Sequence, residues 1–543
     1  MIRGGALPNR QRGLVAVLVI ALLVLGSLLF VFSSSGLTSV RVERERSTLD
    51  ALATSKEGLI AYAVSHTDGV PVVGAPARPG TLPCPDADDD GHEDYDTATD
   101  ACRSLTGRLP WITLGLPDLR DDSGERLWYS VSNDFRSDRR TVPGVPLNSD
   151  TAYRAGNVSL ALSGSALGGN LAAIVIAPGR ALQRADGLSQ NRGCTVGVDC
   201  DATFRCTTVP ASATAKCNPA NYLDLAAAED NADANRGFIA AAESSGFNDR
   251  LLPVFADDIM VLVERRAARE LQRNLRNHYT AWNTSTTVGA GSGFYPFAVP
   301  WNDPASTPAS LGTNNTTAGL LPLSDAPLVW TNVSSACWTE SAGTVLRCQA
   351  FCAFLLGIPV CLPDMPSGRV ENIAVRFVDP PTAANFQFVG VNLGGGGSWN
   401  LNEAQRRLDF SYSGLVSLGF LDVRIIAPQP SSWVSGWLAR NNWHQNAYYA
   451  FAPGFAMNGS KVCGATCFTI SNTSPPVTAK QAVVVVTGRS LAGASIAQQA
   501  RPVATTPAAL AQYMEEANSD GTATVFEIRA RGSAFNDTPV AVP

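Results

Sequence analysis

Charge and histidine are scarce in this chain of 543 residues. Charged residues make up 16% of the sequence, whereas an average soluble domain has about a quarter. The net charge of -6 leaves no basic excess of the kind that marks a nucleic-acid partner. No G-x-S-x-G or H-E-x-x-H motif occurs. These absences disfavour nucleic-acid binding and catalysis. If the protein were an enzyme, a secreted hydrolase would be the alternative function. The only histidines are His66, His92, His278 and His444.

Closely spaced C-x-x-C pairs, which zinc knuckles need, are also missing. The twelve cysteines instead fall into near-neighbour groups, a pattern that predicts disulfide bonds in an oxidising compartment. Two of these groups are simple pairs, Cys84 with Cys102 and Cys463 with Cys467. The other two groups leave their pairing open: Cys194, Cys200, Cys206 and Cys217; Cys337, Cys348, Cys352 and Cys361.

The N-terminus contains one long apolar run. Leu14 to Phe32 is nineteen residues without a charge, enough for a helix to cross a bilayer. Arg3, Arg10 and Arg12 precede it, so the positive-inside rule places the N-terminus in the cytoplasm. The alternative is a secretory signal cleaved near the "SSSG" of residues 33–36.

Helical periodicity follows the apolar run. It predicts an amphipathic helix over residues 37–66, with its inward stripe at Leu49, Leu52, Ala53, Lys56, Ile60 and Ala63. A second such helix is predicted over residues 257–283. Its stripe consists of Ile259, Leu262, Val263, Leu271, Leu275, Tyr279 and Trp282.

About residues 10–136 resemble prepilin-type proteins, the minor pilins and pseudopilins of type IV pilus and type II secretion systems. The resemblance begins with a short basic leader ending in Gly, an apolar helix and an amphipathic continuation. It extends through "KEGLIAYAVSH", "RPGTLPCPDADDDG" and "GRLPWITLGLPDLRDDSGERLWYSVSNDF". At the place where the family carries Glu, this chain has Leu18.

The resemblance implies a function and a location. A prepilin peptidase would cut between Gly13 and Leu14, and the N-terminal helix would pack against other pilin-like subunits. The protein would cross the bacterial inner membrane once, with its heads in the periplasm or, after assembly, in a cell-surface filament. The expected role is a membrane-anchored minor or tip subunit, without enzymatic activity.

The head itself is repeated along the chain. "AAIVIAPGRAL" at 172–182 resembles "QAVVVVTGRSL" at 481–491, and a Tyr-initiated acidic segment and a Phe-Asn-Asp triplet follow each. We expect Arg180 and Arg489 in the repeated turns to pair with Asp249 and Asp537 of the triplets. The predicted fold class is α+β: a transmembrane helix continues into a pilin-like long helix on an antiparallel sheet, and the head is duplicated in tandem. The predicted domains are a leader (1–13), a transmembrane helix (14–36), a first head (37–255) and a second head (256–543).

The second head contains a β-rich insertion at about residues 327–428. Segments such as "RRLDFSYSG" and "LDVRIIAP" alternate apolar and polar residues, as strands with one buried face do. We expect a small β-sandwich here. If it binds a glycan or protein, the alternative function is a surface-displayed adhesin or ligand-binding protein.

The stretch "CPDADDDGHEDYD" holds seven carboxylates in thirteen residues. Asp86, Asp88, Asp90, Gly91 and Asp94 follow the D-x-D-x-D-G-x-x-D order of calcium loops, in which alternate oxygens wrap the ion. The backbone carbonyl of His92 would supply a further ligand. We therefore predict a calcium site enclosed by a Cys84–Cys102 disulfide, with a solvated acidic turn as the alternative.

Overall fold

The computed structural model divides the chain into two compact units. Unit 1 comprises Met1–Tyr62, Leu82–Asp138 and Val158–Phe255, and unit 2 the remaining residues. Side chains and backbone are described for residues 23, 42–65, 78–96, 101–136, 146–150, 152, 171–184, 186–207, 215–223, 231–232, 237–280, 283, 293–296, 298–299, 317–322, 436–456, 460–491, 499 and 507–543. The backbone alone is described for residues 281–282, 159–162, 165–166 and the strands between 329 and 426.

The fold class predicted from the sequence is wrong. Strands predominate in the part of the chain that the structure describes, and no helix there is both long and apolar enough to cross a membrane. The first helix described in full covers residues 42–65 and begins with six exposed residues. Among them are Glu43, Arg44, Glu45 and Arg46, charges that are costly to place in hydrocarbon. Apart from Leu23, the leader and the segment 14–36 lie outside the described residues.

Unit 1 is built on a four-stranded antiparallel sheet of order β3-β4-β7-β9. Its central strand β7 is apolar and buried along its whole length, as expected for a strand covered on both faces. A second sheet of order β6-β5-β8 pairs β5 and β8 in parallel, and β1 pairs with β2. The bounds are β1 (Tyr95–Asp96), β2 (Ala101–Cys102), β3 (Thr106–Arg108), β4 (Trp128–Val131), β5 (Ser159–Leu162), β6 (Ser165–Ala166), β7 (Leu171–Ala177), η4 (Ala215–Cys217), α2 (Ala220–Leu223), β8 (Gly237–Ala240) and β9 (Arg250–Phe255).

Unit 2 has the same strand order. Its antiparallel sheet runs β10-β20-β23-β25, and its second sheet, of order β22-β21-β24, pairs β21 and β24 in parallel. The bounds are α3 (Ala256–Asn283), β10 (Ala318–Leu320), α4 (Trp437–Arg440), η5 (Trp443–Asn446), β20 (Ala447–Phe451), η6 (Pro453–Phe455), η7 (Gly464–Thr466), β21 (Phe468–Ser471), β22 (Val477–Lys480), β23 (Ala482–Val486), η8 (Pro507–Gln512), η9 (Glu516–Ser519), β24 (Val525–Glu527) and β25 (Thr538–Val542).

In each unit, the side chain of one asparagine forms hydrogen bonds to equivalent positions of the fold. In unit 1, the Asn231 side chain accepts a hydrogen bond from Ile239 N (2.7 Å) and donates one to Asp249 (2.9 Å). In unit 2, Asn518 accepts from Glu527 N (2.9 Å) and donates to Asp537 (3.2 Å). We call these two arrangements the asparagine clasps.

The repeated Gly-Arg turns are held by the Phe-Asn-Asp triplets. Asn248 Nδ2 donates to Arg180 O at 2.8 Å, and Asn536 Nδ2 donates to Arg489 O at 2.7 Å. The expected pairing of Arg489 with Asp537 is wrong, because Arg489 lies 3.5 Å from Asp257. Both triplet carboxylates instead accept a hydrogen bond from the asparagine of their own clasp, and Asp537 accepts another from Glu515 N at 3.0 Å.

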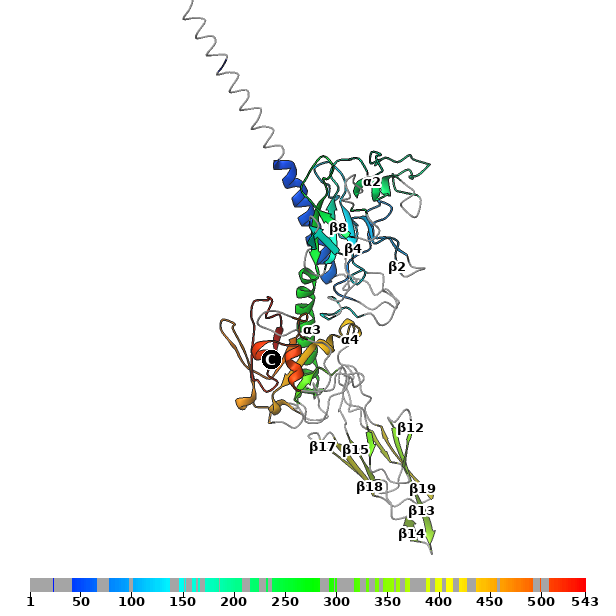
Figure 1. Ribbon diagram of the computed structural model, residues 1–543. Coiled ribbons are helices and arrows are strands. Elements are labelled where there is room, and N and C mark those ends of the chain that lie inside the picture. Colours follow the sequence, from blue (N-terminus) through cyan, green and yellow to red (C-terminus); the bar gives the residue numbers. More distant parts are fainter. Residues whose placement is uncertain are drawn as a thin grey trace, which may run out of the picture. The chain divides into compact units, whose positions relative to one another are not determined.

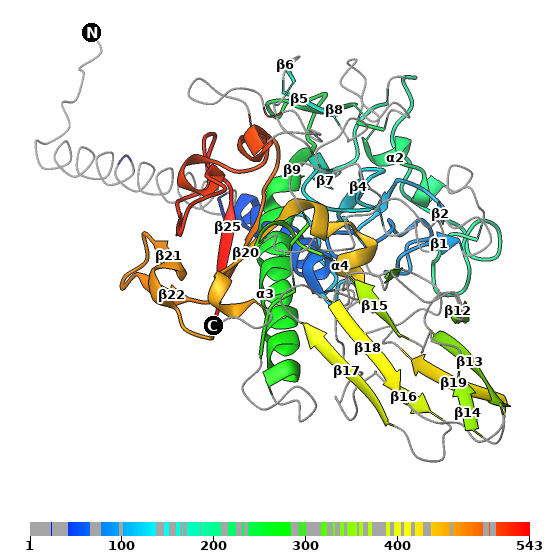
Figure 2. The ribbon, with the colours of Figure 1, turned by 90° about the horizontal axis from the view of Figure 1, so that it is seen from below.

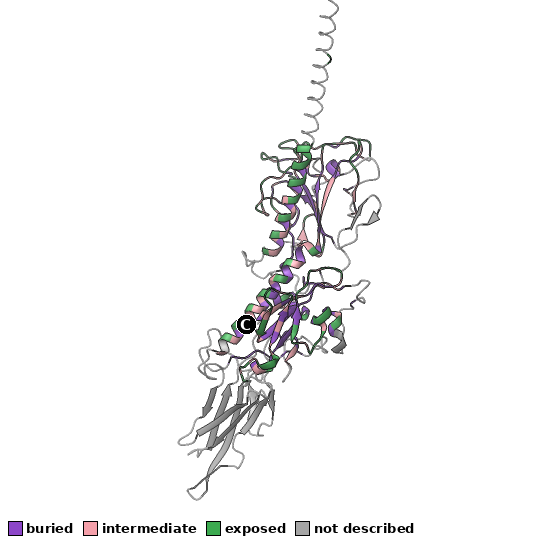
Figure 3. Ribbon diagram, turned by 90° about the vertical axis from the view of Figure 1, so that its left-hand side faces the viewer, coloured by how far each residue is buried: buried purple, intermediate pink, exposed green. Residues whose placement is uncertain are grey.

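The long helices bury one face each (Figure 3). The part of the helix 42–65 that belongs to unit 1 ends at Tyr62. Its buried residues are Thr48, Ala51, Leu52, Ser55 and Leu59. The buried face of this helix differs from the predicted apolar stripe, because Leu49, the first residue of that stripe, is 51% exposed. On α3, the predicted Ile259, Val263, Leu271 and Leu275 are fully buried, whereas Leu262 is 38% exposed. This helix packs on β23 and β25 (Figure 2).

Strands β11 to β19 fall in the segment predicted to be an insertion and form two further antiparallel sheets (Figure 1). One has the order β11-β15-β18-β17, and the other has the order β12-β13-β19-β16 with β14 beside β13. The bounds are β11 (Val329–Thr331), β12 (Cys337–Glu340), β13 (Val345–Leu355), β14 (Ile358–Cys361), β15 (Ser367–Glu371), β16 (Gln387–Gly390), β17 (Gly396–Asn402), β18 (Arg407–Ser413) and β19 (Gly419–Ile426). Backbone register places Cys337 opposite Cys348 and Cys352 opposite Cys361.

Candidate metal centre

The acidic loop of unit 1 is fixed at both ends. A disulfide joins Cys84 to Cys102, and Asp86 exchanges two backbone hydrogen bonds with Arg108 of β3 (3.0 and 2.7 Å). Further along, Asp94 N donates to Pro85 O at 3.3 Å. The loop is therefore a closed turn that starts on the edge of the main sheet.

Two aspartates organise the turn from inside. The Asp86 carboxylate accepts hydrogen bonds from the backbone N–H groups of Asp89 (2.6 Å) and Gly91 (2.7 Å). Asp94 Oδ2 accepts one from Ala87 N at 2.6 Å. Gly91 has φ +88°, and a Cβ there would lie 2.7 Å from Trp111 Nε1, so the turn requires glycine.

Asp86, Asp88 and Asp94 bring their carboxylates together. One oxygen from each lies within 4.8 Å of the others. Burial raises the pKa of Asp86 to about 8, and the neighbouring carboxylates Asp88 and Asp94 add to this against the hydrogen bond from Gly91. Burial and repulsion from Asp94 raise the pKa of Asp88 to about 6. Burial likewise raises the pKa of Asp94. The cluster thus concentrates negative charge where water cannot fully solvate it.

A hard cation fits this cluster. Calcium takes about six to eight oxygen ligands, carboxylates foremost. Asp86 Oδ1 accepts hydrogen bonds from both Asp89 and Asp90, whereas Oδ2 accepts only the one from Gly91 and keeps a second lone pair for a metal. Bound calcium would neutralise the carboxylates of Asp86 and Asp88 and would share Asp94 with Arg103, which lies 3.3 Å from its Oδ1. Asp86, Asp88 and Asp94 are the residues that would hold it.

The other two predicted ligands lie differently. Asp90 is outside this group of three: its Oδ2 is 3.2 Å from Arg205, and its Oδ1 accepts a hydrogen bond from His92 N at 2.7 Å. The ligand predicted from His92 is its backbone carbonyl, which stays a prediction; the residue itself is exposed. The structure therefore brings together three of the four predicted aspartates.

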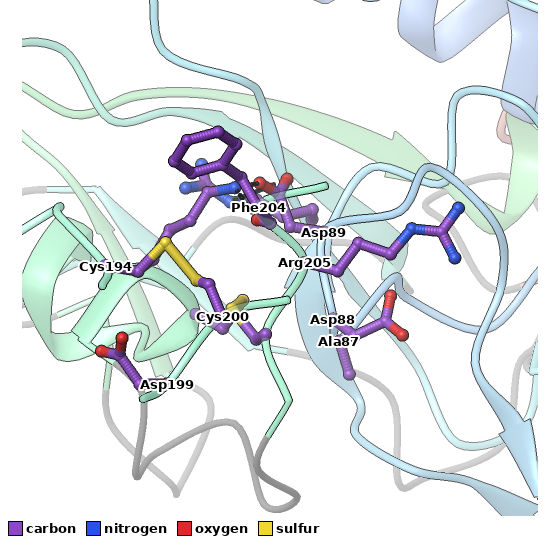
Figure 4. Close-up of a disulfide and its surroundings, with 12 residues drawn as sticks. Ala87, Asp88, Asp89, Cys194, Asp199, Cys200, Phe204 and Arg205 are labelled. Carbon is purple, nitrogen blue, oxygen red and sulfur yellow. Dashed lines mark hydrogen bonds and ion pairs between the residues drawn. A yellow bond between two sulfur atoms is a disulfide. The ribbon is translucent and has the colours of Figure 1, made fainter. Parts of the chain in front are cut away.

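A second cross-linked segment covers the loop. Disulfides join Cys194 to Cys200 and Cys206 to Cys217. Cys206 N donates to Asp88 O at 2.9 Å, and Figure 4 includes Asp88 and Asp89 in the surroundings of the Cys194–Cys200 disulfide. Sequence reasoning missed this contact, because no local pattern links residues more than a hundred positions apart.

The remaining predicted site residues are in unit 2 and at the N-terminus. A disulfide joins Cys463 to Cys467, and no cysteine among the described residues is free. The predicted cleavage site at Gly13 and Leu14 lies outside the described residues. His444 is buried, neither ring nitrogen has a hydrogen-bond partner, and burial lowers its pKa to about 4. A histidine held neutral in this way serves packing.

Comparison with known proteins gives no relative: no protein-family model, no curated protein and no solved structure matches this chain.

Proposed function

We propose that this protein is an exported structural subunit of a prepilin-type filament, in a type IV pilus or a related secretion system. Its two units form a double head, and the acidic loop of unit 1 binds calcium. The proposal gives the protein a minor or tip position, since a double head would fit poorly at every position of a regular filament. Its partners would be other pilin-like subunits at the inner membrane.

The observation that carries the proposal is the set of four disulfides among the residues with described side chains, which occur in both units. Such bonds persist in oxidising compartments and are rare in the cytosol. Export is therefore needed, and the basic leader ending at Gly13 followed by an apolar run is the type of N-terminus that prepilin peptidases process. The calcium loop also agrees with export, because it would meet extracytoplasmic calcium.

Mass spectrometry of the mature N-terminus tests the proposal. When the full chain is expressed with a prepilin peptidase, the N-terminal peptide is expected to begin at Leu14, with an N-methyl group. Gly13→Val places a branched side chain at the cleavage site and should leave the leader attached. An intact Met1 in the wild-type protein, or a start near residue 37, would contradict the proposal.

A surface-displayed adhesin is the second candidate function. It is favoured by the separate sheets β11–β19, whose strands pair only with one another among the described strands. A variant with residues 327–428 replaced by a short Gly-Ser linker should then lose binding to host glycans or matrix proteins that the full chain retains. Its melting temperature would show whether the two heads still fold. Equal binding by both proteins would exclude the insertion as the binding module.

A further inference from the structure

Unit 1 contains a second polar site, a cavity of about 470 Å³ beside the acidic loop. Three acids line it: Asp89, Asp90 and Glu125. We call it the cationic pocket, because its lining also includes six basic side chains: Arg108, Arg120, Arg126, Arg192, Arg205 and Lys216.

Asp89 lies at the centre of the positive charge. Its side chain is 3% exposed and faces Lys216 Nζ at 2.6 Å, Arg126 Nη1 at 2.9 Å and Arg108 Nε at 3.8 Å. One carboxylate thus faces three cations and can neutralise only one of them.

The other acids do not remove this excess. Glu125 is 3.4 Å from Arg192, Asp90 is 3.2 Å from Arg205, and Asp118, just outside the lining, pairs with both Arg120 and Arg126. Asp88 of the acidic cluster also attracts Arg205, so five carboxylates face six cations. In addition, Arg108 Nε is buried without a hydrogen-bond partner. A buried donor left unpaired costs free energy, and an anion in the pocket would relieve that cost.

The basic groups are held in place before any ligand arrives. Arg192 donates to Gly179 O (2.6 Å) and to Gln190 (2.8 Å), and Arg108 donates to Arg126 O (2.9 Å). Both guanidinium groups also lie over the Tyr222 ring, at 4.0 Å for Arg108 and 4.6 Å for Arg192. Fixed donors lose little conformational entropy on binding, which favours affinity.

We infer that the cationic pocket binds a tetrahedral oxyanion, a phosphate or sulfate group. Guanidinium groups match such anions with paired hydrogen bonds, and several guanidinium groups in one pocket suit the three or four oxygens of a tetrahedral anion better than the two of a carboxylate. The volume falls in the range of small-molecule sites, about 300–1,000 Å³. The pocket therefore has room for an organic group that carries the anion, such as a phosphorylated or sulfated sugar.

Isothermal titration calorimetry on the full chain at fixed ionic strength tests this inference. The probes are inorganic phosphate, sulfate and glucose 6-phosphate, with acetate as a monoanion. Arg120→Gln combined with Arg205→Gln removes two charges from the rim, where side chains are 46% and 47% exposed, so folding should be preserved. Arg250→Gln, 36% exposed in the same unit but outside the lining, is the matched control.

We expect the dianions to bind the wild-type protein and acetate not to bind. The double variant should bind about tenfold more weakly or worse, while the Arg250→Gln protein binds like the wild type. Tighter binding of glucose 6-phosphate than of phosphate would identify an esterified ligand, and equal binding would identify the free anion. Absence of binding, or equal weakening by Arg250→Gln, would overturn the inference. Because no step depends on the filament, an intact leader would leave this result unaffected.

Discussion

Asp86→Asn is expected to abolish calcium-dependent stabilisation of unit 1. In the wild-type protein, calcium at about a hundred times its dissociation constant should add about 2.7 kcal/mol to the free energy of unfolding. Asp86 is the most buried of the three clustered aspartates, and its carboxylate lies within 4.8 Å of both others. Asparagine keeps one oxygen, which can accept the hydrogen bonds from Asp89 and Asp90, but it loses the oxygen that accepts from Gly91 and removes the charge that attracts the metal. Thermal melts in calcium and in chelator measure the effect.

Asp121→Asn is the matched control for this substitution. Asp121 is another buried aspartate of unit 1, and it accepts backbone hydrogen bonds from Ser123 (2.9 Å), Glu125 (3.0 Å) and Gly179 (2.8 Å). Asp121 does not belong to the group of three clustered carboxylates, so this variant measures how much stability is lost when a buried turn aspartate outside the cluster becomes asparagine. The calcium shift should remain in Asp121→Asn and vanish in Asp86→Asn. A wild-type protein that melts at the same temperature in calcium and in chelator would refute the metal site.

Arg531→Met should destabilise unit 2 strongly at alkaline pH. Arg531 Nη1 lies 2.6 Å from Glu264 Oε2, and the Glu264 side chain is completely buried. Ser149 Oγ donates to the same carboxylate at 2.9 Å. Removing one partner of a buried ion pair costs about 3–5 kcal/mol, because the other charge stays buried without compensation. Arg529→Met removes a neighbouring arginine that is 44% exposed, and should cost roughly 1 kcal/mol or less.

The pH dependence of this pair gives a second check. Burial raises the pKa of Glu264 to about 7, against the attraction of Arg531 and the hydrogen bond from Ser149, from an unfolded value of 4.5. The folded state therefore binds the proton more tightly than the unfolded state. The contribution of Glu264 is most favourable below pH 4.5 and is lost as the pH rises to about 7. The Arg531→Met defect should accordingly shrink at pH 5, as urea unfolding at the two pH values would measure; a defect independent of pH would contradict it.

Local patterns predicted local structure well. The runs "AAIVIA" and "AVVVV" are continuous and apolar, and they form the central strands β7 and β23. The spacing of Asp86, Asp88 and Asp94 was visible in the sequence, because a tight turn around a glycine converts spacing directly into geometry. Periodicity was less reliable on the helix 42–65. There the polar residues Thr48 and Ser55 are buried, so the buried face of the helix does not coincide with the apolar stripe that begins at Leu49.

Long-range electrostatics could not be predicted. Asp89 looked like one more acid in an acidic run, yet its partners Arg108, Arg126 and Lys216 come from three other places in the chain. Only the fold brings them together, since neither spacing nor composition connects them. The same holds for Glu264 and Arg531, which are separated by most of unit 2. The predicted fold class failed for a related reason: a resemblance at the N-terminus says little about the strands that dominate the remainder.

The two asparagine clasps also bear on how the chain avoids misfolding. Each clasp bonds to backbone groups, and the backbone groups of β8 and β24 are chemically the same. During folding, a strand of one unit could therefore pair with the clasp of the other, the kind of misassembly to which repeated domains are prone. Side chains distinguish the two: Trp128 packs on Tyr222 in unit 1, whereas Tyr448 packs on Phe526 in unit 2. We expect this difference between the aromatic cores to favour pairing of each strand within its own unit, although the hydrogen-bonded frame occurs twice in the chain.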